Sequence, residues 1–336
     1  MKKIVKYSKS YKNISNLQKK YSEENLINLN LVKKFNEKYI KQKKRLVCQN
    51  CKYKINKYTF ISFKVKYSIC ERCGHLNGYH QNTQNFINWV YSIEKGLKHY
   101  NYYSKDFKKR VKNIYLPKAK FLKEVIKKKI NLIEIGSGAG HFLKALELLK
   151  IKSTGYEINK SLVDIGKRKL KINSIVHYSG TETAKVIENG KANVLALVGT
   201  LEHFNDPDIV IKSFLKSKIQ YLYLGVPLFS LSAFIENVFS NTYPRNLSGD
   251  HTNLYTKESL EYLAKKNRLN IVGEWWFGVD MVDLYRSILV SGNKLNQGNY
   301  KKYLDKFLFN HLDQMQNILD KNKICSEVQI VFKKKR

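Results

Sequence analysis

The chain has 336 residues, of which 62 are Lys or Arg and 27 are Asp or Glu, so its formal net charge is +35. Apolar residues make up 43% and include 23 Tyr and 16 Phe, a content that excludes a wholly disordered basic chain. The length favours one large domain with an accessory module. The charge leaves two interpretations open: a polyanion partner, or a solvated lysine surface of the kind that AT-rich codon usage produces.

The N-terminal residues are basic but lead into no uninterrupted apolar stretch, so we expect no secretory signal. No apolar run in the sequence approaches the ~20 residues that span a bilayer. Four of the five Cys form two tight pairs, which fits metal binding in a reducing compartment better than disulfides. We therefore expect a cytoplasmic protein with no transmembrane segment.

Composition and periodicity divide the chain into four parts. Residues 1–45 are rich in Lys, Asn and Ser and predict a basic N-terminal arm that is irregular or partly helical. Residues 46–80 contain the Cys pairs, and residues 81–130 predict a helical connector in which Pro117 starts a new helix. Residues 131–336 alternate short apolar runs with helical stretches, which is typical of a parallel sheet built from βαβ units.

The apolar runs of this last part predict strands at 132–135, 153–157, 174–177, 194–198 and 221–226. The stretches between them predict helices at 142–150, 160–170 and 208–216. After Pro227 the pattern changes to a long insertion. The remaining elements expected are a helix at 257–266, a strand at 269–277, a helical stretch at 300–319 and a closing strand at 327–332.

Two Cys-x2-Cys pairs are separated by 18 residues, and their members are Cys48, Cys51, Cys70 and Cys73. Four thiolates on two tight turns can surround one Zn²⁺ tetrahedrally, so the spacing predicts a zinc ribbon. A site of four thiolates has no open coordination position, and we interpret it as structural. We expect His75 and His80 at the surface rather than among the ligands, and Cys325 as a small core residue.

The densest motif is a strand that runs into glycines at alternate positions, Gly136, Gly138 and Gly140, and then into a helix. Such glycines permit a tight turn and close approach of a ligand, and the helix N-terminus offers unpaired N–H groups. His141 stands where a dinucleotide fingerprint needs Gly, and no P-loop Gly-Lys-Ser/Thr follows. Glu157 ends the next strand, where an acid can accept both hydroxyls of a ribose.

With Glu134 two residues before the first glycine, the motif resembles that of class I S-adenosylmethionine-dependent methyltransferases, acid-x-Gly-x-Gly-x-Gly. Segments 193–207 and 223–227 resemble the family's fourth strand, with its Leu-Glu-His and Asp-Pro continuation, and its fifth strand with a terminal Pro. The resemblance implies an α/β fold with a Rossmann-like, mostly parallel, seven-stranded sheet whose last strand is antiparallel, beside the small N-terminal four-cysteine zinc ribbon. It assigns residues 131–336 to the methyltransferase domain.

The resemblance also implies a cofactor site for S-adenosylmethionine. The glycines would wrap its methionine part, Glu157 would hold the ribose, and Ile158 would pack against the adenine. Thr200 and Leu201 would flank the sulfonium. Residues 177–182 lack the Asp that usually contacts the adenine amine, which leaves adenine recognition open. The full set is Glu134, Gly136, Ser137, Gly138, Gly140, Glu157, Ile158, Thr200 and Leu201.

A ribbon before such a domain resembles a bacterial group of sugar C-methyltransferases and surface-polysaccharide methyltransferases. Segment 248–256 is similar to the family's acid-His-x-x-x-aromatic element, in which the acid–His pair acts as base next to a keto group. The resemblance implies that His251 is the base, that Asp250 orients it, and that Tyr255 lines the pocket or packs under the loop. A purely structural role of His251 in its loop stays an equal alternative.

Three other features have two interpretations each. Tyr102 or Tyr103 would reach the cofactor or substrate, or pack in the core. The aromatic run 275–277 would wall the acceptor pocket or, more commonly, fill the core. Glu202 and His203 would act as a catalytic acid–base pair or, as this segment mostly does in the family, cap and pack. Thr256 has the sequence context of a helix N-cap.

We therefore expect an S-adenosylmethionine-dependent methyltransferase with a structural Zn²⁺, acting on a sugar at carbon or oxygen. The expected partner is a small molecule, an anionic nucleotide sugar or a surface-glycan precursor, which a positive surface would attract. The alternative is an RNA-associated methyltransferase or a nucleic-acid-binding protein that uses the ribbon and the basic arm. Residues 199–202 lack the Asn-Pro-Pro-Tyr/Phe tetrapeptide of base methylation, which weakens that alternative. The intact glycines disfavour a non-catalytic scaffold.

Overall fold

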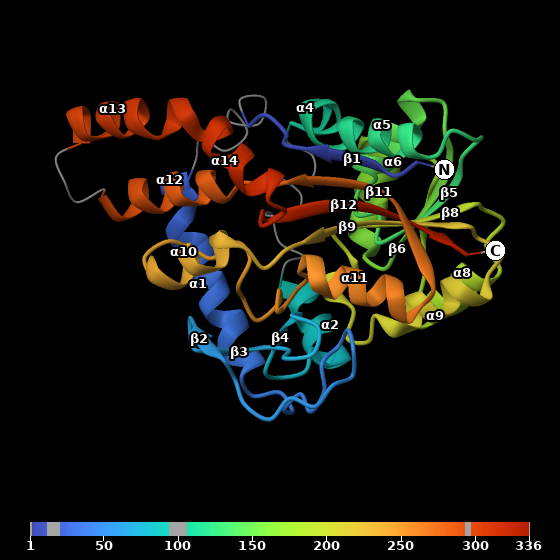
Figure 1. The fold of residues 1–336 in the computed structure, drawn as a ribbon, viewed down its shortest axis with the longest axis horizontal. Coiled ribbons are helices and arrows are strands. Elements are labelled where there is room, and N and C mark those ends of the chain that lie inside the picture. Colours follow the sequence, from blue (N-terminus) through green and yellow to red (C-terminus); the bar gives the residue numbers. More distant parts are fainter. Residues whose placement is uncertain (1, 12–20, 94–105, 293–296, 336) are drawn as a thin grey trace.

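The structure is a computed structural model that describes residues 2–11, 21–93, 106–292 and 297–335. Its centre is an eight-stranded sheet of order β1-β11-β12-β9-β8-β5-β6-β7 (Figure 1). The five strands from β7 to β9 are mutually parallel, and β12 is antiparallel to both of its neighbours. The strands are β1 (Ile4–Tyr7), β5 (Asn131–Ile135), β6 (Lys152–Glu157), β7 (Ile175–His177), β8 (Val194–Val198), β9 (Tyr221–Pro227), β11 (Leu269–Phe277) and β12 (Glu327–Lys334).

The mostly parallel sheet with an antiparallel last strand is confirmed, but the expected number of seven strands is wrong. The eighth strand, β1, comes from the segment predicted to be an irregular arm, and it pairs in parallel with the edge strand β11. The main-chain N–H of Ser8 donates to the Trp276 carbonyl (2.8 Å), and Lys3 forms an ion pair with Glu274 (2.6 Å). The arm thus pairs with a sheet edge that would otherwise stay open.

Helices cover both faces of this sheet. One face carries α5 (Leu116–Val125) and α6 (His141–Leu148), which share a core with β5, β8 and β9. The other carries α8 (Thr183–Glu188), α9 (Asp208–Lys216) and α11 (Lys257–Lys266). The last two have the predicted bounds, whereas the six residues of α8 are too few to show a helical period in the sequence. α7 (Lys160–Asp164) continues as a π-helical turn, Ile165–Lys169.

Other helices flank these two layers. α4 (Phe107–Arg110) leads through a π-helical segment, Val111–Tyr115, directly into α5, and Pro117 lies in the first turn of α5 as predicted. The stretch expected at 300–319 is broken by a 3₁₀ turn, Phe309–His311, into α13 (Gln297–Phe307) and α14 (Leu312–Lys321). α12 (Asp280–Ser291) packs beside them (Figure 1). Among the described residues, every helix is too short or too polar to cross a membrane.

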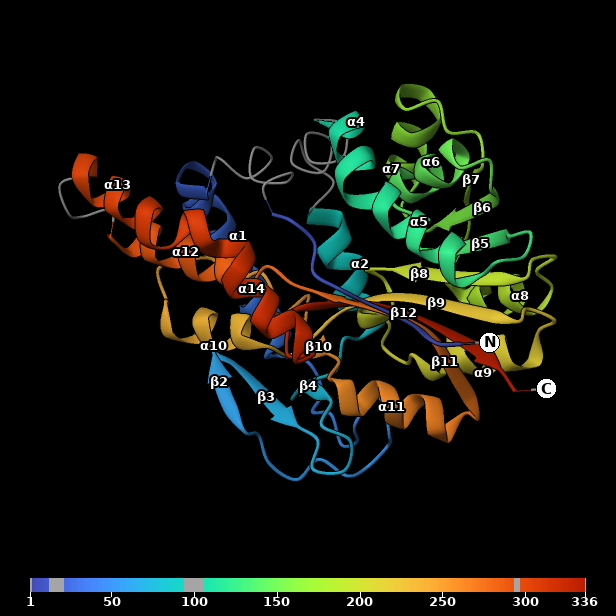
Figure 2. The same cartoon turned by 45° about the horizontal axis from the view of Figure 1, so that its top comes forward.

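A second, four-stranded sheet of order β10-β4-β3-β2 lies on the side of the molecule opposite to α5 and α6 (Figures 1 and 2). Its strands are β2 (Phe60–Ser62), β3 (Val65–Ile69), β4 (Leu76–Gly78) and β10 (Asn253–Leu254). A separate core joins it to α1 (Tyr21–Tyr39), α2 (Gln84–Ile93) and α10 (Leu231–Val238). Because β10 follows β9 in the chain, the insertion after Pro227 and the cysteine segment build one sheet together. The domain boundaries drawn from composition stay a prediction.

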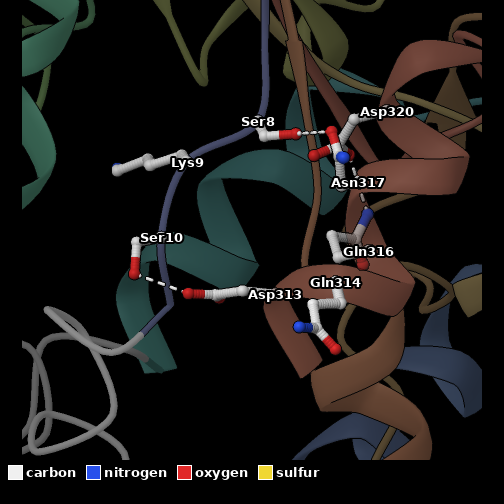
Figure 3. Close-up of a pocket in the computed structure, with 8 residues that line it drawn as sticks. All are labelled: Ser8, Lys9, Ser10, Asp313, Gln314, Gln316, Asn317 and Asp320. Atoms are coloured by element: carbon white, nitrogen blue, oxygen red, sulfur yellow. Dashed lines mark hydrogen bonds between the residues drawn. The ribbon is translucent and has the colours of Figure 1, made fainter. Parts of the chain in front are cut away.

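The N-terminal segment continues past β1 and crosses α14 (Figure 3). The Ser8 hydroxyl donates to Asn317 Oδ1 (2.9 Å), and the Ser10 hydroxyl donates to Asp313 (2.6 Å). A hollow of about 290 Å³ lies along this crossing. The Lys9 side chain points away from α14, toward the ring of Phe277, whose centroid is 5.3 Å from its Nζ. The crossing fastens the N-terminal segment to the C-terminal helices.

Candidate active site

The glycine loop follows β5 and needs glycine for two physical reasons. Gly136, Gly138 and Gly140 have φ values of 74°, 55° and 86°, in the left-handed region that side chains rarely adopt. A Cβ on Gly136 would also lie 2.3 Å from the Thr200 side chain, beyond the end of β8. The Gly140 N–H donates to the Ser137 carbonyl (2.9 Å), and α6 begins at His141. The loop thus turns sharply against Thr200, whose hydroxyl donates to the Gly136 carbonyl (3.3 Å).

Glu157, at the end of β6, contacts this loop directly. Its carboxylate accepts from the main-chain N–H of Gly138 (2.8 Å) and from that of Asn159 (2.8 Å). Burial raises the pKa of Glu157, although both hydrogen bonds favour its charged form. Ile158 follows with 38% of its surface exposed. The structure therefore brings the predicted ribose acid onto the glycine loop, with the predicted adenine contact beside it.

A cavity of about 380 Å³ opens between the glycine loop and the ends of β8 and β9. Glu134 and Ser137 line it, and both are buried. One carboxylate oxygen of Glu134 and the Ser137 hydroxyl have no hydrogen-bond partner among the described residues. Burial, and then Glu157, raise the pKa of Glu134 well above its usual range. Buried polar atoms in this state are satisfied by a polar ligand, and a cationic one would stabilise the carboxylate.

The opposite wall of the cavity includes Glu202, Arg245, Asn246 and His251. His251 Nδ1 lies 2.8 Å from the main-chain carbonyl of Asn246. The Asn246 carbonyl thus orients His251 at Nδ1, whereas Asp250 Oδ1 accepts from the Ser248 hydroxyl (2.5 Å), and an orienting role of Asp250 stays a prediction. Burial, followed by the nearby His203, lowers the pKa of His251 to about 3. The imidazole is neutral at physiological pH, and it is a weak base as long as it has no further partner.

Two predicted site residues lie in the core instead of on the cavity wall. Tyr255 is 1% exposed and packs edge-on against His75, with ring centroids 4.7 Å apart. Leu201 is also 1% exposed and belongs to the core beneath α9 and α11. Tyr255 thus fits the packing alternative, and the side chain of Leu201 is part of the core, so its contact with the sulfonium stays a prediction.

Other sequence expectations have clear outcomes. Trp275 and Trp276 are buried in the two cores of the main sheet and do not line the cavity. Thr256 is the N-cap of α11, since its hydroxyl accepts from the Ser259 N–H (3.1 Å). Cys325 is buried as expected. Tyr102 and Tyr103 lie outside the described residues.

The structure also shows wall residues that the sequence did not indicate. Lys118, from α5, forms an ion pair with Glu327 of β12 (2.6 Å), and both line the cavity. Arg245 donates to Asp283 of α12 through Nε and one terminal nitrogen, the shortest contact being 2.8 Å. These pairs join residues far apart in the chain, so no local spacing marks them.

Glu236, a buried residue of α10, holds the loop that carries His251. Its carboxylate accepts from three consecutive main-chain N–H groups, those of residues 245–247, at 2.9–3.0 Å. It also accepts from the Asn246 side-chain amide (3.0 Å). The Asn246 carbonyl is the group that orients His251. Glu236 therefore acts on the cavity indirectly, by fixing the main chain of its wall.

The four predicted metal ligands meet in one buried cluster. The Sγ atoms of Cys48, Cys51, Cys70 and Cys73 all lie within 4.8 Å of one another. The Cys51 and Cys70 sulfurs are 3.4 Å apart and those of Cys48 and Cys73 are 3.8 Å apart, and a tetrahedral zinc with ~2.3 Å bonds to sulfur places ligands ~3.8 Å apart. Side-chain amides of Asn50 and Asn77 donate to two of the sulfurs (3.6 and 3.5 Å). The cluster fits a zinc ion coordinated by four thiolates.

The expectation for His75 was wrong: it is 1% exposed, under the cluster. Burial lowers its pKa to about 4. His75 is buried because the cysteine segment packs closely on the main domain. The Gln49 amide donates to the Asn205 carbonyl (2.8 Å), and the Asn50 amide donates to the Ser259 carbonyl (2.9 Å). The first cysteine turn therefore contacts the segment just after Glu202.

A family model and several solved structures of methyltransferases are similar to this chain. The family model described as "Methyltransferase domain" matches residues 107–274, half of the chain. A SAM-dependent methyltransferase structure from Archaeoglobus fulgidus is 19% identical and covers 70% of this chain and 99% of its own (TM-score 0.42). One from Thermotoga maritima is 16% identical and covers 70% and 96% (TM-score 0.43). Geranyl diphosphate C-methyltransferase from Streptomyces coelicolor is 12% identical and covers 72% and 86% (TM-score 0.42). A search of curated proteins found no match.

Proposed function

Since the chain belongs to the methyltransferase-domain family, we propose that it transfers a methyl group from S-adenosylmethionine to a sugar, at carbon or oxygen. The sugar is nucleotide-linked or a precursor of a surface glycan. The observation that carries the proposal is that the glycine loop and the residues opposite to it, Glu202, Arg245 and His251, line one and the same cavity. Its volume of about 380 Å³ falls in the range of small-molecule sites, roughly 300–1,000 Å³.

The glycine loop and the end of β6 form the cofactor side of this proposal. Glu157 would share its carboxylate between the Gly138 N–H and the ribose hydroxyls, and Ile158 would cover the adenine. Glu134 and Ser137 have buried polar atoms without partners, which suit the charged end of the cofactor. When bound, S-adenosylmethionine supplies a methyl group that is already activated by its sulfonium. The chain then has to exclude water and align the acceptor.

The opposite wall would bind the acceptor. Arg245 is held by Asp283 at the cavity and would attract an anionic group such as a sugar-linked diphosphate. His251 and Glu202 offer nitrogen and oxygen acceptors for hydroxyl groups of a sugar. We propose His251 as the residue that touches the reacting part of the acceptor. Because its lowered pKa makes His251 a weak base, a second group beside it has to help remove a proton from the acceptor.

The cysteine cluster would hold a structural zinc. Cys48, Cys51, Cys70 and Cys73 use all four tetrahedral positions, so the ion would bind no substrate. Its turns pack on residue 205 and on α11, which places this ion where it stabilises the segment that carries Glu202. We also propose, from the sequence, a cytoplasmic location.

Calorimetric titration tests the cofactor half of the proposal. The wild type should bind S-adenosylmethionine, and Glu157→Ala should weaken the affinity about 10- to 100-fold, since hydrogen bonds to charged groups contribute about 1.5–3 kcal/mol. His311→Ala, an exposed change on a 3₁₀ turn that does not line this cavity, is the control and should leave affinity within about twofold. No binding by the folded wild type would refute the assignment.

Kinetics test the acceptor half. With a nucleoside-diphosphate sugar as acceptor, Arg245→Gln should raise KM about 10-fold or more while the affinity for S-adenosylmethionine stays unchanged. Methyl transfer to RNA with no transfer to any sugar of a panel would instead favour a nucleic-acid substrate and contradict the proposal. Salt dependence of RNA binding would support that contrary result.

A further inference from the structure

A second group of metal-ligating side chains lies at the acceptor end of the cavity. Glu202 and His203 belong to a 3₁₀ turn, Leu201–His203, directly after β8, and His251 precedes β10. One carboxylate oxygen and one ring nitrogen from each histidine all lie within 4.8 Å of one another. The two imidazole rings have centroids 5.3 Å apart. Three chemically suitable donors from two distant segments thus converge on one point.

Glu202 provides an independent sign that a cationic partner belongs here. Its side chain is 5% exposed, and one of its carboxylate oxygens has no hydrogen-bond partner among the described residues. Its main-chain carbonyl accepts from the Asn253 side-chain amide (3.1 Å), which holds the backbone that carries this side chain. A buried carboxylate oxygen without a donor is unfavourable, and a bound cation would satisfy it.

The two histidines are oriented as metal-binding histidines are. His251 Nδ1 lies 2.8 Å from the Asn246 carbonyl, and His203 Nδ1 lies 3.3 Å from the Asp250 carbonyl. A carbonyl oxygen only accepts, so each Nδ1 carries the proton and each Nε2 keeps a lone pair. Histidine ligands commonly donate the other ring N–H to a main-chain carbonyl in this manner.

We propose that Glu202, His203 and His251 bind a divalent transition-metal ion at the acceptor end of the cavity. Two imidazole nitrogens and one carboxylate oxygen favour zinc, manganese or iron over magnesium and calcium, which prefer oxygen ligands. Ligand atoms at ~2.1 Å from an ion are ~3.0–3.5 Å apart, so the three side chains have to close by at most ~2 Å. Side-chain rotation supplies such a movement.

The inference rests on the proposed function for its role. Glu202 and His251 line the same cavity as the glycine loop, so the ion would lie beside the methyl acceptor. Three protein ligands leave coordination positions open, and a hydroxyl or keto oxygen of the acceptor can occupy one of them. In this arrangement His251 reaches the acceptor through the bound ion, which replaces the direct contact of the ring proposed above.

Cobalt titration of the full-length, zinc-loaded protein tests the site. Co²⁺ should bind with one equivalent per chain and give d–d absorption without the thiolate-to-cobalt band that marks a cysteine site. His203→Ala and Glu202→Gln should each weaken this binding at least 10-fold. His311→Ala, an exposed histidine of another 3₁₀ turn, is the matched control and should bind as the wild type does. If His203→Ala does not fold, His203→Gln replaces it.

Two results would overturn the inference: no Co²⁺ uptake at the spectroscopic site in the folded wild type, or unchanged uptake in the folded His203 and Glu202 variants. Its failure is separable from failure of the proposed function. Calorimetric binding of S-adenosylmethionine depends on the glycine loop, so cofactor binding without Co²⁺ uptake removes the metal site alone. Methyl transfer that stays constant after selective removal of this ion would contradict its role at the acceptor.

Discussion

Substituting alanine for Gly136 adds a single methyl group, which tests how closely the glycine loop approaches Thr200 after β8. Gly136→Ala places a Cβ 2.3 Å from Thr200 Cγ2 and 2.6 Å from its hydroxyl oxygen, at a φ of +74°. The left-handed conformation costs about 1–2 kcal/mol and the overlap about 1–3 kcal/mol, so unfolding free energy should fall by about 2–5 kcal/mol. The unfolding entropy of 336 residues is about 0.7 kcal/mol/K, so Tm should fall by roughly 3–7 °C, with weaker binding of S-adenosylmethionine.

Scanning calorimetry and cofactor titration measure both effects. Adding Thr200→Ala to Gly136→Ala removes the two closest contacts and should restore the part of the loss due to overlap, while the backbone part remains. Gly298→Ala is the control, because no atom lies within 4 Å of its Cβ, and it should keep or raise Tm. A Gly136→Ala variant with wild-type Tm and affinity would refute the close approach of loop and strand.

Four further predictions concern single residues. Cys48→Ser should lose the thiolate-bound zinc and lower Tm, as metal analysis and calorimetry would show; retained stoichiometric zinc would contradict the four-thiolate site. Glu236→Gln places an N–H group opposite main-chain donors, so the free energy of unfolding should fall by about 1–3 kcal/mol and kcat should fall too. His251→Ala should lower kcat to a similar extent without the same loss of Tm. Burial lowers the pKa of Lys9 to about 7, below the value of 10.5 for an unperturbed lysine. Lys9 is charged in both the folded and the unfolded state below pH 7, so its burial lowers the free energy of unfolding most there, and the loss fades toward pH 10. Lys9→Met should therefore raise Tm by about 2–4 °C at pH 6 and less at pH 9, and a gain that grows with pH would disprove this. Glu157→Gln should bind S-adenosylmethionine more weakly than the wild type and more tightly than Glu157→Ala in the same titration.

Local patterns predicted the elements that carry their own periodicity. The strands β5 to β9, β11 and β12 and the helix α11 lie close to their expected positions because burial on one or both faces repeats along them. β1 was missed, since its four residues, Ile-Val-Lys-Tyr, show no alternation of apolar and polar residues and its partner is more than 260 residues away. The pairing of β10 with β4 likewise joins distant segments, since Asn253 and its partner Asn77 are 176 residues apart in the chain.

The site residues likewise divide into those that a local sequence motif predicted and those that contacts between distant segments position. The glycines and Glu157 lie in one continuous motif, so their placement on a common loop followed from spacing. The cysteine pairs likewise specify a cluster by themselves. Asp250 was adjacent to His251 in the chain, yet the ring turned to a main-chain carbonyl because Glu236 fixes that segment. Such a long-range hydrogen-bond network leaves no sequence signal.

The most direct measurement is mass analysis of an acceptor after incubation with S-adenosylmethionine. The account predicts that a nucleoside-diphosphate sugar gains one methyl group, that S-adenosylhomocysteine forms in equal amount, and that the Glu157→Ala variant slows both. Methylation of RNA with an unmodified sugar panel, or no methyl transfer by a wild type that is folded and metal-loaded, would contradict it.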